Sequence, residues 1–174
     1  MRRLSIPTLT VLIVFVFSAS ARAQDKRTLL AGGLSIMHTD ENPAGIAVNV
    51  SKPLVTHGSM AFGAVADFGT SNFEHFRGTT LGGGVRVTGT SNAKVKPFGQ
   101  FQLGIFHRAD HVCPTYTSCS KTDFGGAFGG EINYAITKML NALAEIDLGM
   151  VKAETSNKKG MRVLFGVSVP IGKE

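Results

Sequence analysis

The sequence has no tryptophan and only two cysteines and two tyrosines among its 174 residues, and only 17% of its residues are charged. It also lacks the short motifs of common enzyme sites: there is no Gly-x-Ser-x-Gly nucleophile elbow, no zincin helix motif and no phosphate-cradling loop. The run Gly82-Gly83-Gly84 is not followed by a helical pattern, so it does not indicate a nucleotide site. We therefore expect no catalytic residues, no cofactor and no metal ion, and we expect that the protein is not an enzyme.

Long apolar runs are missing after the first 23 residues, whereas a membrane-spanning helix needs roughly 20 consecutive apolar residues. At the start of the chain, Arg2 and Arg3 precede the apolar stretch Leu9 to Phe17, and Ala21-Arg22-Ala23 supplies small residues at a cleavage site. This is the pattern of a secretory signal peptide, and its apolar stretch is too short for a retained membrane anchor. We expect residues 1–23 to be cleaved and residues 24–174 to form one domain. If the mature chain enters a membrane, it must do so as a closed barrel.

A strong excess of basic charge is also absent from the mature chain. Removing Arg2, Arg3 and Arg22 leaves 15 basic against 12 acidic residues, so the net charge falls from +6 to +3. The sequence therefore gives little support for nucleic-acid binding.

Eight segments of the mature chain alternate bulky apolar residues with small or polar ones. Successive residues of a strand point to opposite faces, and a membrane strand needs one apolar face. The fifth segment shows this most clearly, with Phe101, Leu103 and Ile105 opposite Gln100 and Gln102. The segments are about 9–11 residues long, which suits a membrane strand. The pattern predicts an all-β fold, an eight-stranded antiparallel up-and-down transmembrane β-barrel.

The seventh segment, from Leu140 to Met150, is the weakest of the eight. It is rich in strong helix formers, and Leu143, Ile146 and Met150 also have helical spacing. A helix is therefore an open alternative at this position.

The small and polar faces of the strands carry the candidate interior residues. Eight strands enclose room only for their own side chains or one small ligand, and buried charges must be paired. We expect a salt-bridge and hydrogen-bond network made by Asp67, Arg86, Gln100, Gln102, Glu131, Glu145, Asp147 and Arg162. Two alternatives are an acid/base or cation-binding pair at Glu145 and Asp147, and a path for a small solute or ion.

The connections between segments alternate in length and composition. Long polar connections are predicted at Thr70 to Gly78, Arg108 to Thr122 and Ala153 to Gly160, and a turn of unusual length at Lys52 to Gly58. Since function on such folds resides in loops, surface contacts are expected there. The candidate contact residues are Phe73, His75, Phe76, Arg77, Tyr116, Lys158 and Lys159.

The two cysteines, Cys113 and Cys119, lie in the longest of these connections. In an exported protein such a pair most economically forms one disulfide bond. The alternative is a zinc site that combines them with His107 and His111.

The aromatic residues offer a test between a membrane barrel and a soluble one. Phenylalanine and tyrosine near strand ends would form girdles at the membrane interfaces. The candidates are Phe68, Phe98, Phe106, Phe124, Tyr134 and Phe165. A soluble, lipocalin-like ligand-binding barrel would instead turn its apolar face inward. The small, lightly charged character of the polar face favours the membrane version.

Two stretches carry a family resemblance, Lys96-Pro97-Phe98-Gly99-Gln100-Phe101-Gln102-Leu103-Gly104 and Phe124-Gly125-Gly126-Ala127-Phe128-Gly129-Gly130-Glu131. Together with the signal peptide and the meander of eight segments, they resemble the small outer-membrane β-barrels typified by OmpA and OmpX. The family commonly ends on an aromatic residue that resembles a signal for the insertion machinery, whereas this chain ends Pro170-Ile171-Gly172-Lys173-Glu174, with Phe165 earlier in the last segment.

The resemblance implies a location in the bacterial outer membrane with both termini on the periplasmic side. The implied partners are outer-membrane lipid, the insertion machinery and an extracellular ligand or surface, with a structural or surface-interaction role.

Overall fold

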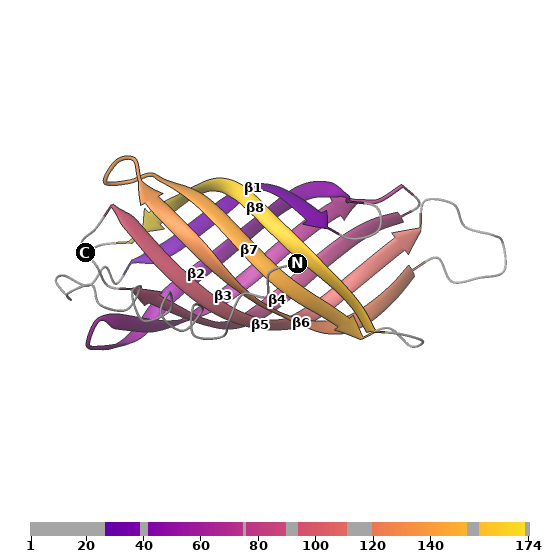
Figure 1. The fold of residues 1–174 in the computed structure, drawn as a ribbon, viewed down its shortest axis with the longest axis horizontal. Coiled ribbons are helices and arrows are strands. Elements are labelled where there is room, and N and C mark those ends of the chain that lie inside the picture. Colours follow the sequence, from indigo (N-terminus) through magenta and orange to yellow (C-terminus); the bar gives the residue numbers. More distant parts are fainter. Residues whose placement is uncertain are drawn as a thin grey trace, which may run out of the picture.

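The computed structural model describes residues 27–38, 42–74, 76–89, 94–110, 120–152 and 157–172. These residues form one closed antiparallel barrel, in which each strand pairs with the next along the chain and β1 pairs with β8 (Figure 1). The strands are β1 (Thr28–His38), β2 (Ala44–His57), β3 (Met60–Asn72), β4 (Phe76–Gly89), β5 (Val95–Asp110), β6 (Ser120–Ala135), β7 (Asn141–Lys152) and β8 (Asn157–Ile171). The predicted eight-stranded up-and-down barrel is confirmed.

The barrel has two distinct ends. At the terminal end β1 begins and β8 finishes, and the turns β2–β3, β4–β5 and β6–β7 lie at the same end. At the opposite end, here called the loop end, lie the other four connections. The terminal end is on the left of Figure 1.

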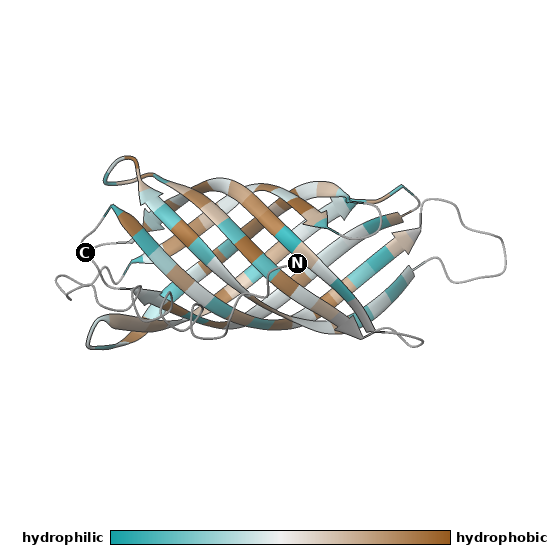
Figure 2. Ribbon diagram, in the orientation of Figure 1, coloured by the Kyte–Doolittle hydropathy of each residue, from teal (hydrophilic) through white to brown (hydrophobic). Residues whose placement is uncertain are grey.

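Strand alternation sends most bulky apolar side chains outward and mainly polar or small ones inward, where Leu143 and Leu164 are buried apolar exceptions. Leu34 of β1 is 69% exposed, whereas Glu145 of β7 is fully buried. Hydrophobic and hydrophilic residues alternate along the strands in Figure 2. This arrangement is the reverse of a soluble ligand-binding barrel, whose apolar face would line the interior. It is the arrangement expected of a barrel surrounded by lipid.

The seventh segment is a strand and not a helix. β7 pairs with β6 on one side and with β8 on the other, so its backbone groups join two ladders. Barrel closure thus overrides the helix propensity of its residues. In the part of the chain that the structure describes, no helix is long and apolar enough to cross a membrane.

The prediction of a turn from Lys52 to Gly58 is wrong. β2 continues to His57, and the hairpin closes at Gly58 and Ser59, where Gly58 has a positive φ of 58°. The pairing register shifts between Pro53 and Val55, which places an extra residue in a bulge. A bulge accommodates a proline within a strand, so Pro53 does not end β2.

The predicted loops are also longer than the connections in the structure, because the strands extend into them. β3 reaches Asn72 and β4 begins at Phe76, although the sequence predicted a loop from Thr70 to Gly78. β5 and β8 likewise extend into the other two predicted loops. Outward residues near the loop end, such as Thr70 and Asn72, are polar, and this composition resembles that of a loop.

Glycine allows two strands to approach closely where the barrel closes. A Cβ atom added to Gly166 of β8 would lie 2.7 Å from the Cα atom of Gly33 in β1. A side chain at this position would push the two strands apart, so glycine is required here for strong coiling of the sheet.

Candidate functional site

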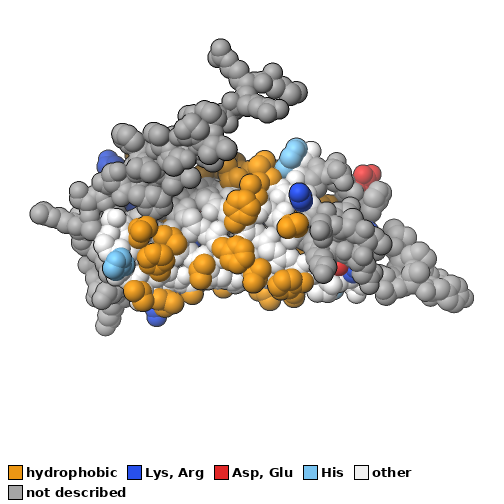
Figure 3. All heavy atoms as spheres, turned by 60° about the horizontal axis from the view of Figure 1, so that its bottom comes forward, with side chains coloured by type: hydrophobic (Ala, Val, Ile, Leu, Met, Phe, Trp, Pro, Cys, Tyr) orange, Lys and Arg blue, Asp and Glu red, His pale blue; other side chains and the backbone are white. Residues whose placement is uncertain are grey.

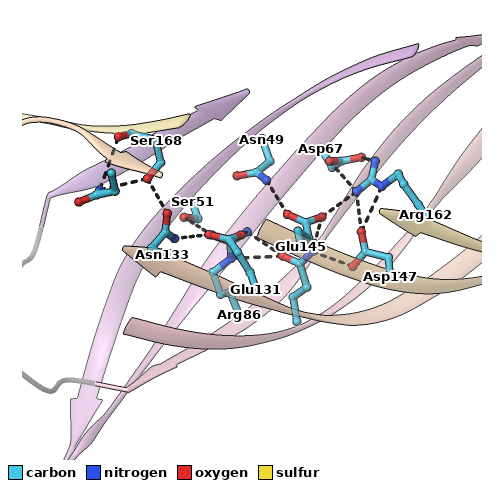
Figure 4. Close-up of polar contacts among 12 residues, drawn as sticks. Asn49, Ser51, Asp67, Arg86, Glu131, Asn133, Glu145, Asp147, Arg162 and Ser168 are labelled. Atoms are coloured by element: carbon cyan, nitrogen blue, oxygen red, sulfur yellow. Dashed lines mark hydrogen bonds and ion pairs between the residues drawn. The ribbon is translucent and has the colours of Figure 1, made fainter. Parts of the chain in front are cut away.

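The barrel interior holds a continuous polar network, part of which is shown in Figure 4. The structure places all eight of the predicted interior residues on the inner face of the barrel. Each is buried except Arg162, whose side chain is 12% exposed. The residues are Asp67 (β3), Arg86 (β4), Gln100 and Gln102 (β5), Glu131 (β6), Glu145 and Asp147 (β7) and Arg162 (β8).

Arg86 is the centre of the first cluster. Its Nη2 atom lies 2.8 Å from Oε2 of Glu131 and donates to Oε1 of Gln100 at 2.7 Å. Its Nη1 atom donates to the Ser51 hydroxyl at 3.1 Å, and its guanidinium carbon lies 5.2 Å from the ring centre of Phe98. One guanidinium is thus paired with one carboxylate, and the remaining donors are largely satisfied by neutral groups.

Arg162 is the centre of the second cluster and contacts three carboxylates. Nη1 lies 2.7 Å from Oδ1 of Asp67, and Nη2 lies 2.7 Å from Oδ2 of Asp147. The same Nη2 atom lies 2.9 Å from Oε1 of Glu145. These partners come from β3 and β7, so Arg162 joins strands on both sides of the lumen.

Gln100 connects the two clusters. Its Oε1 atom accepts hydrogen bonds from Arg86, while its Nε2 atom donates to Glu145 and to Asp147, each at 3.0 Å. Asn49 adds a contact from β2, since its Nδ2 atom donates to Oε2 of Glu145 at 3.1 Å. The Oδ1 atom of Asn49 and the Nε2 atom of Gln102 are buried without a hydrogen-bond partner.

The charges of the two clusters are unequal. Arg86 balances one carboxylate, that of Glu131, whereas Arg162 is shared by Asp67, Glu145 and Asp147. Among the described residues of this network, two guanidinium groups therefore face four carboxylates. The excess of negative charge lies around Arg162.

The network also contains polar residues outside the predicted set. Asn133 donates to Glu131, and its Oδ1 atom accepts from the Ser168 hydroxyl at 2.7 Å. Asn141 donates to the same hydroxyl at 3.1 Å. Each of these residues, like Ser51, has inner-face parity in the sequence, so the alternation already predicts that it belongs to the polar interior.

Phenylalanine side chains pack inside the barrel toward both ends. Phe98 is buried beneath Arg86 near the terminal end. At the loop end, the rings of Phe73 and Phe76 stack with centres 4.1 Å apart, and Phe106 meets Phe73 edge-on at 6.4 Å. The guanidinium of Arg108 lies 4.2 Å from the centre of the Phe76 ring.

This packing corrects two expectations. Phe98 and Phe106 do not belong to a lipid-facing girdle, because they share strand parity with Gln100 and Gln102 and point inward. Phe73 is not an exposed loop residue but is buried against Phe76 and Phe106. The other girdle candidates, Phe68, Phe124, Tyr134 and Phe165, are exposed on the outer surface.

The remaining candidate contact residues have different surroundings. Arg77 is exposed and donates from Nε to the Thr70 hydroxyl at 3.1 Å, and Lys159 is exposed on β8. Phe76 is half-buried in the aromatic stack. Lys158 belongs to β8, but its side chain, and the whole of His75 and Tyr116, lie outside what the structure describes.

The predicted signal peptide and the two cysteines fall outside the part of the chain that the structure describes. Residues 1–23, Cys113, Cys119 and His111 lie outside the described residues, so cleavage and the disulfide bond remain predictions. His107 contacts the Thr122 hydroxyl at 2.8 Å. Within the described ranges, no group of three His, Cys, Asp or Glu side chains is arranged to hold a metal ion.

Comparison with known proteins gives similarity at the level of structure. No protein-family model matches the sequence, and no curated protein sequence matches it significantly. The neisserial surface protein A superposes with a TM-score of 0.65 at 13% identity, covering 86% of this chain and all of the other. Ail, the attachment invasion locus protein of Yersinia pestis, superposes with a TM-score of 0.52 at 13% identity, covering 85% of this chain and all of Ail. The chain thus has the fold of small eight-stranded outer-membrane β-barrels.

Proposed function

We propose that the protein is a non-enzymatic barrel of the bacterial outer membrane, with a structural or surface-interaction role. The observation that carries this proposal is the inverted distribution of side chains, with bulky apolar residues outside and an ion-paired network inside. Water cannot solvate such an outer face favourably over its whole circumference, whereas hydrocarbon can. The two similar barrels are, by name, a surface protein and an attachment protein.

The partners follow from this placement. The apolar belt contacts outer-membrane lipid, the insertion machinery folds the exported chain, and the loop end faces the outside, where it contacts an extracellular ligand or surface. Of the predicted contact residues, Arg77 and Lys159 are exposed near this end and are available for such contacts. Removal of residues 1–23 and a Cys113–Cys119 disulfide belong to the same proposal.

The alternative of a solute or ion conduit is less well supported. The side chains that would line a path instead bond one another, and Gln100 bridges Arg86 to Glu145 and Asp147 across the lumen. The inward-facing phenylalanines described above restrict access to this network further. A filled interior is the expected state of a barrel of this size.

Cell fractionation combined with electrophoresis tests the proposal. We expect the protein in the outer-membrane fraction, with a mass reduced by residues 1–23 and with a different mobility before and after boiling, because a closed barrel resists unheated detergent. Recovery in the soluble periplasmic fraction, with the same mobility in both samples, would reject the proposal.

A further inference from the structure

The three hairpins that close at the terminal end share one feature: an exposed lysine in or near the turn lies beside exposed apolar side chains, although Lys52 itself belongs to strand β2 and precedes the turn. In the β2–β3 hairpin Lys52 precedes Leu54 and Val55, which are 66% and 62% exposed. After the β4–β5 turn, Lys94 precedes Val95, which is 45% exposed.

In the β6–β7 turn, Lys138 lies between Ile136 and Met139, which are 54% and 56% exposed. The same combination thus recurs at three separate places around the barrel rim.

Exposed basic side chains occur at both ends, including Arg77, Lys121 and Lys159 at the loop end, but among the described residues an exposed acidic side chain occurs only at the loop end. Lys52, Lys94 and Lys138 are exposed at the terminal end, where none of the described acidic side chains is exposed. At the loop end Glu74 is exposed, and Asp123 lies 3.7 Å from Lys121. In Figure 3 the acidic side chains are visible only toward the right, which is the loop end, and patches of apolar side chains are visible along the barrel.

Lys52 continues the lipid-facing surface of β2. Lys52 has the same strand parity as Val48 and Val50, both of which are exposed on the outer face of β2. An aliphatic side chain at a membrane border enters the hydrocarbon, while a neighbouring lysine extends its ammonium group to the headgroups. This combination is suited to a phosphate-bearing lipid surface.

We propose that the terminal end binds the phosphate groups of an anionic glycerophospholipid leaflet through Lys52, Lys94 and Lys138. This inference rests on the proposed membrane placement and adds a lipid preference to it. The lysines are distributed around the rim and flanked by apolar side chains, which fits a surrounding leaflet better than one acidic protein docked at a single patch. Each lysine near an anionic membrane surface strengthens association by roughly fivefold.

Spin-labelled lipids test the proposal in bilayers of phosphatidylcholine that contain the reconstituted full chain. We expect spin-labelled phosphatidylglycerol to associate with the barrel about twofold more strongly than spin-labelled phosphatidylcholine, since the lysine contacts are averaged over all lipids that surround the barrel. The triple variant Lys52→Gln, Lys94→Gln, Lys138→Gln loses this preference, and so does the wild type in high salt. The matched control Arg77→Gln, Lys121→Gln, Lys159→Gln removes the same number of positive charges at the loop end. We expect this control to retain the preference for phosphatidylglycerol.

The mobility shift on boiling is measured for every sample, so that only folded barrels are compared. Equal association of the two lipids with the folded wild type overturns the inference while leaving the membrane placement intact. An equal loss of preference in both triple variants also overturns it, because net charge and not the terminal end would then be responsible. A wild-type chain that does not reconstitute into bilayers rejects the membrane placement as well.

Discussion

At the scale of single residues, the interior network is defined by how many carboxylates each arginine serves. Glu131 is the carboxylate paired with Arg86, whereas Glu145 shares Arg162 with Asp67 and Asp147. Removing one partner of a buried one-to-one pair leaves an uncompensated charge, which is strongly destabilising. Removing one of three carboxylates around a single guanidinium instead reduces mutual repulsion. The two glutamates should therefore respond differently to the same substitution.

We predict that Glu131→Gln lowers the free energy of unfolding by about 3 kcal/mol, whereas Glu145→Gln leaves it unchanged or raises it. Asn49 explains the tolerance at position 145. Its Nδ2 atom donates to Glu145 while its Oδ1 atom has no partner, so a turned carboxamide could accept a hydrogen bond from the new amide. Urea unfolding in phospholipid vesicles, followed by the mobility shift on boiling, measures both variants.

Lys121→Met serves as a control, because Lys121 forms a partly exposed ion pair with Asp123 at 3.7 Å. Such pairs contribute about 0–1 kcal/mol, so this variant should unfold nearly as the wild type does. A larger loss of stability for Glu145→Gln than for Glu131→Gln would contradict the assignment of the excess charge to the Arg162 cluster.

At the scale of elements, neighbouring glycines of one strand have different roles. In β4, a Cβ atom added to Gly84 would lie 2.7 Å from the Cα atom of Gln102 and still closer to the carbonyl oxygen of Phe101. A Cβ atom added to Gly83 would meet nothing nearer than 3.6 Å. β4 and β5 therefore approach each other closely at Gly84, and the adjacent residue is free of this constraint.

We predict that Gly84→Ala lowers the free energy of unfolding by about 1–3 kcal/mol, because the methyl group must displace the backbone of β5. Gly83→Ala should change it by less than about 0.5 kcal/mol. The two variants add the same methyl group to adjacent residues, so each is the control for the other in the same urea titration. Equal destabilisation by the two would show that glycine flexibility, and not the close approach of β5, explains the requirement.

At the scale of the whole molecule, barrel closure separates two environments. The ladder between β1 and β8 leaves no open edge along the paired part of the sheet, and the strands turn mostly polar or small side chains inward, together with a few bulky ones such as Leu143, Leu164 and Phe98. The interior is then filled from several strands at once, with Arg162 reaching β3 and β7 and Gln100 linking the two arginine clusters. A filled lumen and a lipid-facing exterior are two consequences of the same alternation.

We predict that the purified barrel gives no stepwise single-channel currents in planar lipid bilayers, because hydrogen-bonded and ion-paired side chains fill its interior. A general porin inserted under the same conditions is the control for insertion and detection. The sample recovered from the bilayer experiment is run on a gel with and without boiling, and a shift in mobility shows that the barrel stayed folded. Steady currents that change when Arg86 or Glu145 is neutralised would instead support the conduit.

The sequence by itself determined the alternation of the segments, the face to which their side chains point and the set of charged residues inside, but it left a helix open at the seventh segment. Period-two alternation is a local property, and it contains this information without knowledge of strand partners. The parity of β5 even places Phe98 and Phe106 inside, although their aromatic character suggested a girdle. The residues at which strands end were harder to predict from the sequence, because polar outward residues at the loop end have the composition of a loop.

Only the tertiary structure decided which of the inward residues meet. Contacts such as Asp67 with Arg162 and Asn49 with Glu145 join residues about a hundred positions apart, and they depend on barrel closure and pairing register. A shift of register would leave the parity of the sequence unchanged while giving each arginine different partners. The unequal sharing of carboxylates between Arg86 and Arg162 is therefore a property of the closed barrel, whereas the presence of those charges inside it is already a property of the sequence.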